Sequence, residues 1–256
     1  MGFDNKLLDT ARTLADIAGQ ICRNHYSRPI NAERKADASP VTQADREVEA
    51  ALRAHIVQHF PCHGIFGEEE ARHQPDAPIQ WVIDPIDGTR AFMAGYPTFT
   101  NLIAVTENGV PQLGIINQPI TGERWTGHNG STRINHAPAR CRDTTELRHA
   151  VVATTSAPYH FSVQESAAFE KVRAQCAQVV VGGDGYGYGK LASGHLDLFI
   201  DAGLKPYDFC ALVPVVTGAG GIITDWQGND LTLESCGDVI AAATKALHTE
   251  ALQYLK

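Results

Sequence analysis

Residue types that bind metal ions and phosphate follow an apolar run in the segment Trp81-Val82-Ile83-Asp84-Pro85-Ile86-Asp87-Gly88-Thr89. The apolar run predicts a short buried strand, and Pro85 and Gly88 predict a sharp turn at its end. Asp84 and Asp87 should then lie at the carboxyl end of that strand, with Thr89 near the start of the next helical segment. Anionic oxygen ligands beside a helix N-terminus can hold cations and a phosphate group.

Asp84 and Asp87 fit other chemistries less well. A calcium loop of the EF-hand type needs a glutamate at its twelfth position, and counting from Asp84 that position is Gly95. A covalent aspartyl phosphatase would carry its acids at i and i+2 after the strand. Here they stand at i and i+3 with proline between them, which disfavours a phospho-aspartate but keeps it as an alternative. A third alternative is that both acids only accept hydrogen bonds from turn amides.

Three further acids stand where predicted elements meet. Glu68 follows an apolar segment that ends on Gly67. Asp208 precedes a predicted helix over 209–219, where it could also serve as the N-cap. Asp45 stands three residues after Thr42, which is the spacing of a capping box, so a capping role is the alternative there.

Cations would be required if Glu68, Asp84, Asp87 and Asp208 lay close together, because four carboxylates repel one another. All-oxygen ligands select Mg²⁺ or Mn²⁺ over zinc or copper. Two such ions would activate a water molecule and stabilise the leaving oxygen of a phosphate ester. The set of acids therefore points to phosphate chemistry more strongly than any one of them does.

The elements that must position these acids fall into two halves. Hydrophobic periodicity predicts helices over 4–26 and from Thr42 onward, a surface loop over 33–40, and an antiparallel-rich region with strands at 99–106 and 110–117. Strands and helices then alternate, which predicts an α/β half, at 151–155, 165–176, 178–181, 185–193 and 196–200. Pro214 predicts a kink in the helix over 209–219.

Composition narrows the class of protein. The chain has 256 residues and a net charge of −8, with no run of Lys or Arg, so nucleic acid and anionic membranes are poor partners. No segment is long and apolar enough for a membrane span, and residues 1–6 lack a secretion signal. The six cysteines are scattered, which disfavours zinc and disulfides and favours free thiols in a reducing cytoplasm.

The combined motifs resemble the inositol monophosphatase family. They are Gly67-Glu68-Glu69, Asp84-Pro85-Ile86-Asp87-Gly88-Thr89 and Tyr207-Asp208, with Lys35, Thr42, Asp45 and Gly218-Ala219-Gly220-Gly221 extending the likeness over nearly the whole chain. The resemblance implies an α+β fold with the layered αβαβα architecture of sugar phosphatases, in one compact globule. It would comprise a metal-site half (1–144) and an α/β half (145–256). It also implies a homodimer that depends on Mg²⁺, with Mn²⁺ as a possible substitute, and that is inhibited by Li⁺.

The same resemblance assigns metal ligands. Glu68, Asp84 and the carbonyl of Ile86 would hold one Mg²⁺ ion. Asp84, Asp87 and Asp208 would hold a second ion, and Glu68 would help a looser third ion through water.

Catalysis and phosphate binding are assigned in the same way. Asp45 would pair with the Thr89 hydroxyl and deprotonate the attacking water. The amides of Gly88 and Thr89 would bind the phosphate group at a helix N-terminus.

Substrate choice is expected to come from residues outside the metal site. Asp184, Gly183, Asp201 and Lys205 resemble the histidinol-phosphatase branch of the family, in which the two acids could pair with the ammonium and imidazole groups of L-histidinol phosphate. An inositol-1-monophosphatase or a broad-specificity sugar or nucleotide phosphatase is the alternative, because polyol hydroxyls could bind the same acids. A non-catalytic metal- or phosphate-binding regulator is an alternative from another class.

Overall fold

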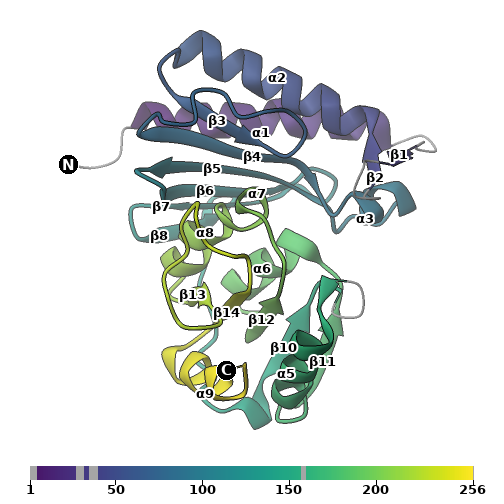
Figure 1. Cartoon of the computed structure of the whole chain (residues 1–256), viewed down its shortest axis with the longest axis vertical. Coiled ribbons are helices and arrows are strands. Elements are labelled where there is room, and N and C mark those ends of the chain that lie inside the picture. Colours follow the sequence, from purple (N-terminus) through teal and green to yellow (C-terminus); the bar gives the residue numbers. More distant parts are fainter. Residues whose placement is uncertain (1–4, 27–31, 35–39, 157–159, 256) are drawn as a thin grey trace.

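Two large β-sheets separated and flanked by helices make up most of the protein, in a computed structural model that describes residues 5–26, 32–34, 40–156 and 160–255. The layers run in the order helices, sheet, helices, sheet, helices (Figure 1). This confirms the predicted αβαβα architecture, with an antiparallel-rich first half and an α/β second half. No helix in the described ranges is long and apolar enough to cross a membrane.

The first sheet has seven strands in the order β3-β4-β5-β6-β7-β8-β9. Only β3 and β4 pair in parallel, and every later pair is antiparallel. Short turns such as the one at Asn108 and Gly109 make this meander possible, because both residues adopt positive φ. The strands are β3 (Gly64–Gly67), β4 (Ile79–Asp87), β5 (Thr100–Glu107), β6 (Val110–Gln118), β7 (Glu123–His128), β8 (Ser131–Ile134) and β9 (Ala137–Pro138).

Two long helices, α1 (Asn5–Tyr26) and α2 (Gln43–His59), cover the outer face of this sheet. Their apolar stripes, including Leu14 and Leu52, pack with Trp81 and Ile83 of β4 in one buried core. Burying each large apolar side chain contributes about 2 kcal/mol. Between the helices, β1 (Ala32–Arg34) pairs with β2 (Pro40–Thr42). The prediction of a surface loop over 33–40 was therefore wrong at residues 33–34 and 40, which belong to these strands, and residues 35–39 lie outside the described ranges.

The second sheet has five strands in the order β11-β10-β12-β14-β13. The β10 strand pairs in parallel with both neighbours, whereas β14 is antiparallel to β12 and β13. The outer helices are α5 (Val163–Arg173) and α9 (Lys245–Leu255), and a short 3₁₀ turn (Leu147–His149) precedes the sheet. The strands are β10 (Val151–Thr154), β11 (Gln178–Val181), β12 (Leu198–Asp201), β13 (Ile222–Asp225) and β14 (Val239–Ala242).

Three helices of the second half fill the space between the sheets: α6 (Asp184–Ala192), α7 (Pro206–Phe209) and α8 (Leu212–Gly218). The α6 helix contacts β5 and β12, and α8 contacts β6, β7 and β13. The first sheet ends at Pro138 and the second begins at Val151, on either side of the division predicted between residues 144 and 145. That division into halves stays a prediction.

The prediction of one helix over 209–219 was wrong. The chain instead forms α7 and α8, separated by a turn at Cys210 and Ala211. Pro214 has no amide proton to donate to the carbonyl of Cys210, so a continuous helix would lack a hydrogen bond at this point. Lys205 is the N-cap of α7, and Asp208 is therefore the third helical residue rather than the N-cap.

Candidate active site

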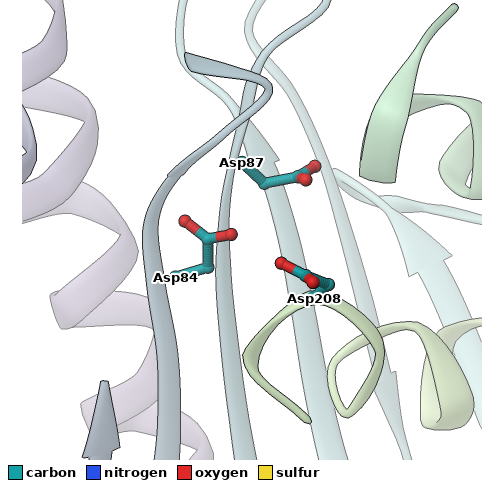
Figure 2. Close-up of side chains that lie close together, drawn as sticks. All are labelled: Asp84, Asp87 and Asp208. Atoms are coloured by element: carbon teal, nitrogen blue, oxygen red, sulfur yellow. The ribbon is translucent and has the colours of Figure 1, made fainter. Parts of the chain in front are cut away.

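Three aspartates from both halves of the chain meet between the sheets. Asp84 and Asp87 come from β4, and Asp208 comes from α7. One carboxylate oxygen from each lies within 4.8 Å of the others, and Figure 2 shows the three side chains close together. Asp84 is buried and the other two are partly buried. The structure therefore brings together three of the acids that the sequence singled out.

A β-bulge turns Asp84 and Asp87 to the same side of β4. Asp84 pairs with Leu102 and Asp87 pairs with Thr100, so three steps along β4 match two along β5. In a regular strand, residues at i and i+3 point to opposite faces, and the extra residue of a bulge cancels that difference. Pro85 lies within the bulge, where a missing amide proton is tolerated. The predicted turn thus begins only at Gly88, because the strand continues through Asp87.

Hydrogen bonds from separate elements fix the three carboxylates. The Ile86 amide donates to Oδ1 of Asp84 at 3.0 Å. Oδ2 of Asp87 accepts from the Thr100 hydroxyl at 3.0 Å and from the Gly185 amide at 2.6 Å. The Lys205 amide donates to Oδ2 of Asp208 at 2.6 Å. The carboxylates are therefore held in place before any ligand binds.

Burial and mutual repulsion make this cluster costly when it is ionised. Burial is the main cause that raises the pKa of Asp84 well above its usual value, and Glu68, Asp87 and Asp208 raise it further. Burial, with Asp184 and Asp208, does the same to the pKa of Asp87. Burial raises the pKa of Asp208 to about 7. A set of hard oxygen donors that repel one another in this way fits divalent cations such as Mg²⁺.

Glu68 and Asp45 lie close to the cluster and come from other elements, the end of β3 and the first turn of α2. Glu68 follows β3 and lines the cavity described below, and its charge helps to raise the pKa of Asp45, Asp84 and Asp208. Desolvation is the main cause of the raised pKa of Asp45, which is fully buried. Glu68 is thus close enough to Asp84 and Asp208 to influence their pKa values, and its role as a metal ligand stays a prediction.

Asp45 forms the capping box that its spacing predicts. Its Oδ2 accepts hydrogen bonds from the Thr42 amide at 2.8 Å and the Thr42 hydroxyl at 2.5 Å. Its Oδ1 is buried and accepts no hydrogen bond from the described residues. The Thr89 hydroxyl donates to the Ile86 carbonyl at 3.1 Å, so Asp45 and Thr89 have separate partners here. Their pairing stays a prediction.

A cavity of about 900 Å³ opens beside the three aspartates. Gly88 and Thr89, which were predicted to bind phosphate, line it at the start of α3 (Thr89–Ala94), with Gly88 at φ 81°. Gly183, Asp184 and Asp201 line the same cavity. Lys205 is not among the lining residues, and its amide serves to hold Asp208 instead.

Asp184 reaches the predicted phosphate site from the second half of the chain. A side chain at Gly88 would place its Cβ 2.9 Å from Oδ2 of Asp184, so glycine is required there. Burial raises the pKa of Asp184 to about 6, and the nearby Arg90 opposes this shift. Asp184 adopts φ 43° after two glycines with φ of 101° and 114°, an uncommon backbone conformation that often marks a functional site.

Asp201 is held by four donors of the protein itself. Oδ1 accepts from the Thr154 hydroxyl at 3.1 Å and the Thr155 amide at 2.8 Å. Oδ2 accepts from the Thr155 hydroxyl at 2.9 Å and the Tyr188 hydroxyl at 3.1 Å. Burial raises its pKa to about 7, and these donors oppose the shift. Its contact with the substrate stays a prediction. In the structure, the Asp201 carboxylate links the end of β12 to the end of β10 and to α6.

Sequence reasoning missed several residues of the site. Gly185 and Thr100 bind Asp87, and Arg90 lies in the cavity wall close enough to Asp184 to influence its pKa. Arg90 had a local signal, because a basic residue directly follows the predicted phosphate-binding Thr89. Gly185 belongs to the segment Gly182-Gly183-Asp184-Gly185, whose glycines permit close backbone approach, but its partner Asp87 lies 98 residues away and could not be predicted.

Known proteins resemble this chain over nearly its full length. A bifunctional phosphatase of Arabidopsis thaliana, IMPL2, chloroplastic, is 42% identical over 95% of this chain and 73% of its own length. A histidinol-phosphatase of Chlorobaculum parvum is 33% identical over 94% of this chain and 93% of its own length. The structure of an inositol monophosphatase from Zymomonas mobilis superposes with a TM-score of 0.90 at 47% identity, covering 98% of each chain.

The family model of the inositol monophosphatases matches residues 4–256. This match covers both sheets and all the helices described above. The family implies a divalent metal ion, and the three clustered aspartates are suitable ligands for one. The chain therefore belongs to the inositol monophosphatase family and is a metal-dependent phosphomonoesterase.

Proposed function

We propose that this phosphomonoesterase hydrolyses L-histidinol phosphate to L-histidinol and phosphate. The observation that carries the proposal is the Asp184 carboxylate. It lines the cavity next to Gly88, and it accepts no hydrogen bond from the part of the chain that the structure describes. An acid left available beside the phosphate site is suited to a substrate that carries a positive charge near its phosphate.

Charge balance supports a cationic substrate. Asp184 adds an acid to the cavity beyond the metal-site cluster, and the nearby Arg90 offsets only part of its charge. An ammonium or imidazolium group would form a charge-assisted hydrogen bond with Asp184. A polyol would hydrogen-bond to Asp184 without neutralising it. The histidinol-phosphatase among the relatives supports the same substrate.

The residues divide the chemistry between them. Glu68, Asp84, Asp87, Asp208 and the Ile86 carbonyl would hold Mg²⁺. When bound there, Mg²⁺ lowers the pKa of water and offsets the charge that develops on the phosphate group.

Asp45 and Thr89 would orient the attacking water and accept its proton, a role for which the raised pKa of Asp45 is suitable. The amides of Gly88 and Thr89 would bind the phosphate oxygens. Asp184 would bind the cationic end of the substrate.

An inositol-1-monophosphatase is the second candidate. The observation that favours it is the 47% identity to the Zymomonas mobilis protein, which is described as an inositol monophosphatase. A broad-specificity sugar or nucleotide phosphatase would use the same site. We further propose a homodimer, as the family resemblance implies, in the cytoplasm, where the six free thiols of the chain would stay reduced.

The proposal is tested by comparing substrates at saturating Mg²⁺. Values of kcat/KM would be measured for L-histidinol phosphate, myo-inositol 1-phosphate, fructose 1,6-bisphosphate and adenosine 3′,5′-bisphosphate. L-Histidinol phosphate should be the best substrate by about tenfold or more, since one charge-assisted contact contributes about 1.5–3 kcal/mol. If myo-inositol 1-phosphate is better, the second candidate replaces the first. If phosphate is released from none of them, the enzymatic assignment fails.

A further inference from the structure

A buried acid of α2 contacts the segment that carries Glu68. Glu49 is completely buried, one helical turn after Asp45. Its Oε2 accepts a hydrogen bond from the Glu69 amide at 2.7 Å, and its Oε1 accepts one from the Glu70 amide at 3.0 Å. Both amides directly follow Glu68 in the chain. Glu49 therefore fixes the backbone on the C-terminal side of that residue.

The Arg53 guanidinium offsets the negative charge of the buried Glu49 carboxylate. Its Nε donates to Oε1 of Glu49 at 2.8 Å, and its Nη2 donates to the Glu70 carbonyl at 3.0 Å. The Arg53 side chain is 11% exposed, so the pair is shielded from water. A buried acid without such a partner would be strongly disfavoured. The two side chains together bind the amide of Glu69 and both the amide and the carbonyl of Glu70.

Gly67, the residue before Glu68, packs closely against the Glu49 carboxylate. A side chain on Gly67 would place its Cβ 2.2 Å from Oε1 of Glu49. No rotation of the chain end could relieve this contact, because Oε1 is already held by Arg53 and the Glu70 amide. Gly67 ends β3 and is hydrogen-bonded into the sheet beside β4. Glu68 is thus held from β3 on one side and from Glu49 on the other.

We propose that Glu49 is a positioning residue that aims the Glu68 carboxylate at the three-aspartate cluster. The α2 helix then serves the site twice, through Asp45 and, one turn later, through Glu49. The inference rests on the proposed role of Glu68 as a metal ligand. Removing a group that orients a metal ligand commonly weakens metal affinity by about 10- to 100-fold.

The first test replaces Glu49 with glutamine (Glu49→Gln). An amide has the same shape, but its NH₂ group would face a backbone N–H, and Arg53 would keep only its longer ion pair with Glu70, at 3.6 Å. In the metal-free protein, hydrogen exchange of the Glu69 and Glu70 amides should accelerate by about tenfold or more. The Mg²⁺ dissociation constant, measured by calorimetry, should rise by about tenfold. Glu47→Gln is the matched control, because Glu47 is exposed on the same helix.

A purely structural role gives a different result. In that case Glu49→Gln would lower the melting temperature, but the Mg²⁺ dissociation constant would equal that of Glu47→Gln, and the inference would be overturned. If Glu49→Gln does not fold, Arg53→Lys replaces it, since lysine keeps the charge but cannot make both contacts of Arg53. A Mg²⁺ dissociation constant about threefold higher is expected for Arg53→Lys, and an unchanged constant contradicts the inference.

A double-mutant cycle separates this inference from the proposed function. If Glu49 acts through Glu68, Glu49→Gln should leave the Mg²⁺ dissociation constant unchanged in a Glu68→Gln background. An additive effect would overturn the positioning role alone. If Glu68→Gln by itself leaves Mg²⁺ binding unchanged, the proposed ligand role of Glu68 fails first, independently of Glu49.

Discussion

The amide of Gly185 donates a 2.6 Å hydrogen bond to Oδ2 of Asp87. This contact joins the first turn of α6 to the bulged end of β4, so the second half of the chain directly orients an acid of the first half. The approach is close enough that a Cβ on Gly185 would lie 2.7 Å from the same oxygen. The site is therefore assembled by the packing of α6 between the two sheets.

The tight packing of α6 predicts an unusual response to alanine. In most helix interiors a change from glycine to alanine is stabilising by about 1 kcal/mol. At Gly187, however, the new Cβ would lie 2.0 Å from the ring of Phe199. Gly187→Ala should therefore lower the free energy of unfolding by about 1–3 kcal/mol, as measured by urea denaturation. A stabilised variant would show that α6 does not pack as described.

Thr89 should be important for turnover and unimportant for folding. Its hydroxyl makes one hydrogen bond, to the Ile86 carbonyl, at the edge of the cavity. Thr89→Ala should reduce kcat by about 10²-fold, because the attacking water loses its orienting group. The melting temperature should change little. Thr98→Ala, at another position lining the cavity, is the control and should keep near-normal kcat. Equal kcat in the two variants would remove Thr89 from catalysis.

The acidic cluster should lower the free energy of unfolding when no metal is bound. Because the folded pKa of Asp84 is raised, its contribution to stability is present at low pH and is lost as pH rises through that value. Asp84→Asn keeps an acceptor for the Ile86 amide but removes one repelling charge. At about pH 8 the metal-free variant should be more stable than wild type by about 1–2 kcal/mol. Thermal unfolding with a chelator present measures this difference, and a less stable variant contradicts it.

Binding of Mg²⁺ should weaken in acid. The pKa of Asp208 is raised to about 7, and Mg²⁺ binds the ionised carboxylates. Between about pH 8 and about pH 6 the Mg²⁺ dissociation constant should therefore rise, by up to about tenfold per pH unit for each proton displaced. Calorimetry in buffers of different ionisation enthalpy would count the released protons. A dissociation constant independent of pH in this range would show that the cluster is already ionised.

Local patterns in the sequence were enough to predict individual helices and strands and to single out the acids of the metal site, whereas the layered architecture was implied by the family resemblance. The apolar run into Asp84 and the helical periodicity of residues 4–26 each carry their own signal, and the structure confirms both elements. The bulge was not predicted, because Pro85 is equally compatible with a turn and with a bulged strand.

Contacts between distant segments could not be read from the sequence. The four donors to Asp201 come from β10, the residue after it and α6, and Glu49 meets Glu69 across twenty residues. Burial determines these roles, because a buried carboxylate must find donors wherever the fold places them. The capping box of Asp45 was predictable for the opposite reason, since all of its atoms lie within one helical turn.

Asp184→Asn tests most directly the claim that substrate choice lies outside the metal site. The measurement is the ratio of kcat/KM for L-histidinol phosphate to kcat/KM for myo-inositol 1-phosphate, in wild type and in the variant, at saturating Mg²⁺. We predict a ratio above one in wild type that falls by about tenfold in Asp184→Asn, while kcat for myo-inositol 1-phosphate is maintained. A ratio below one in wild type, or one that Asp184→Asn leaves unchanged, would contradict the account.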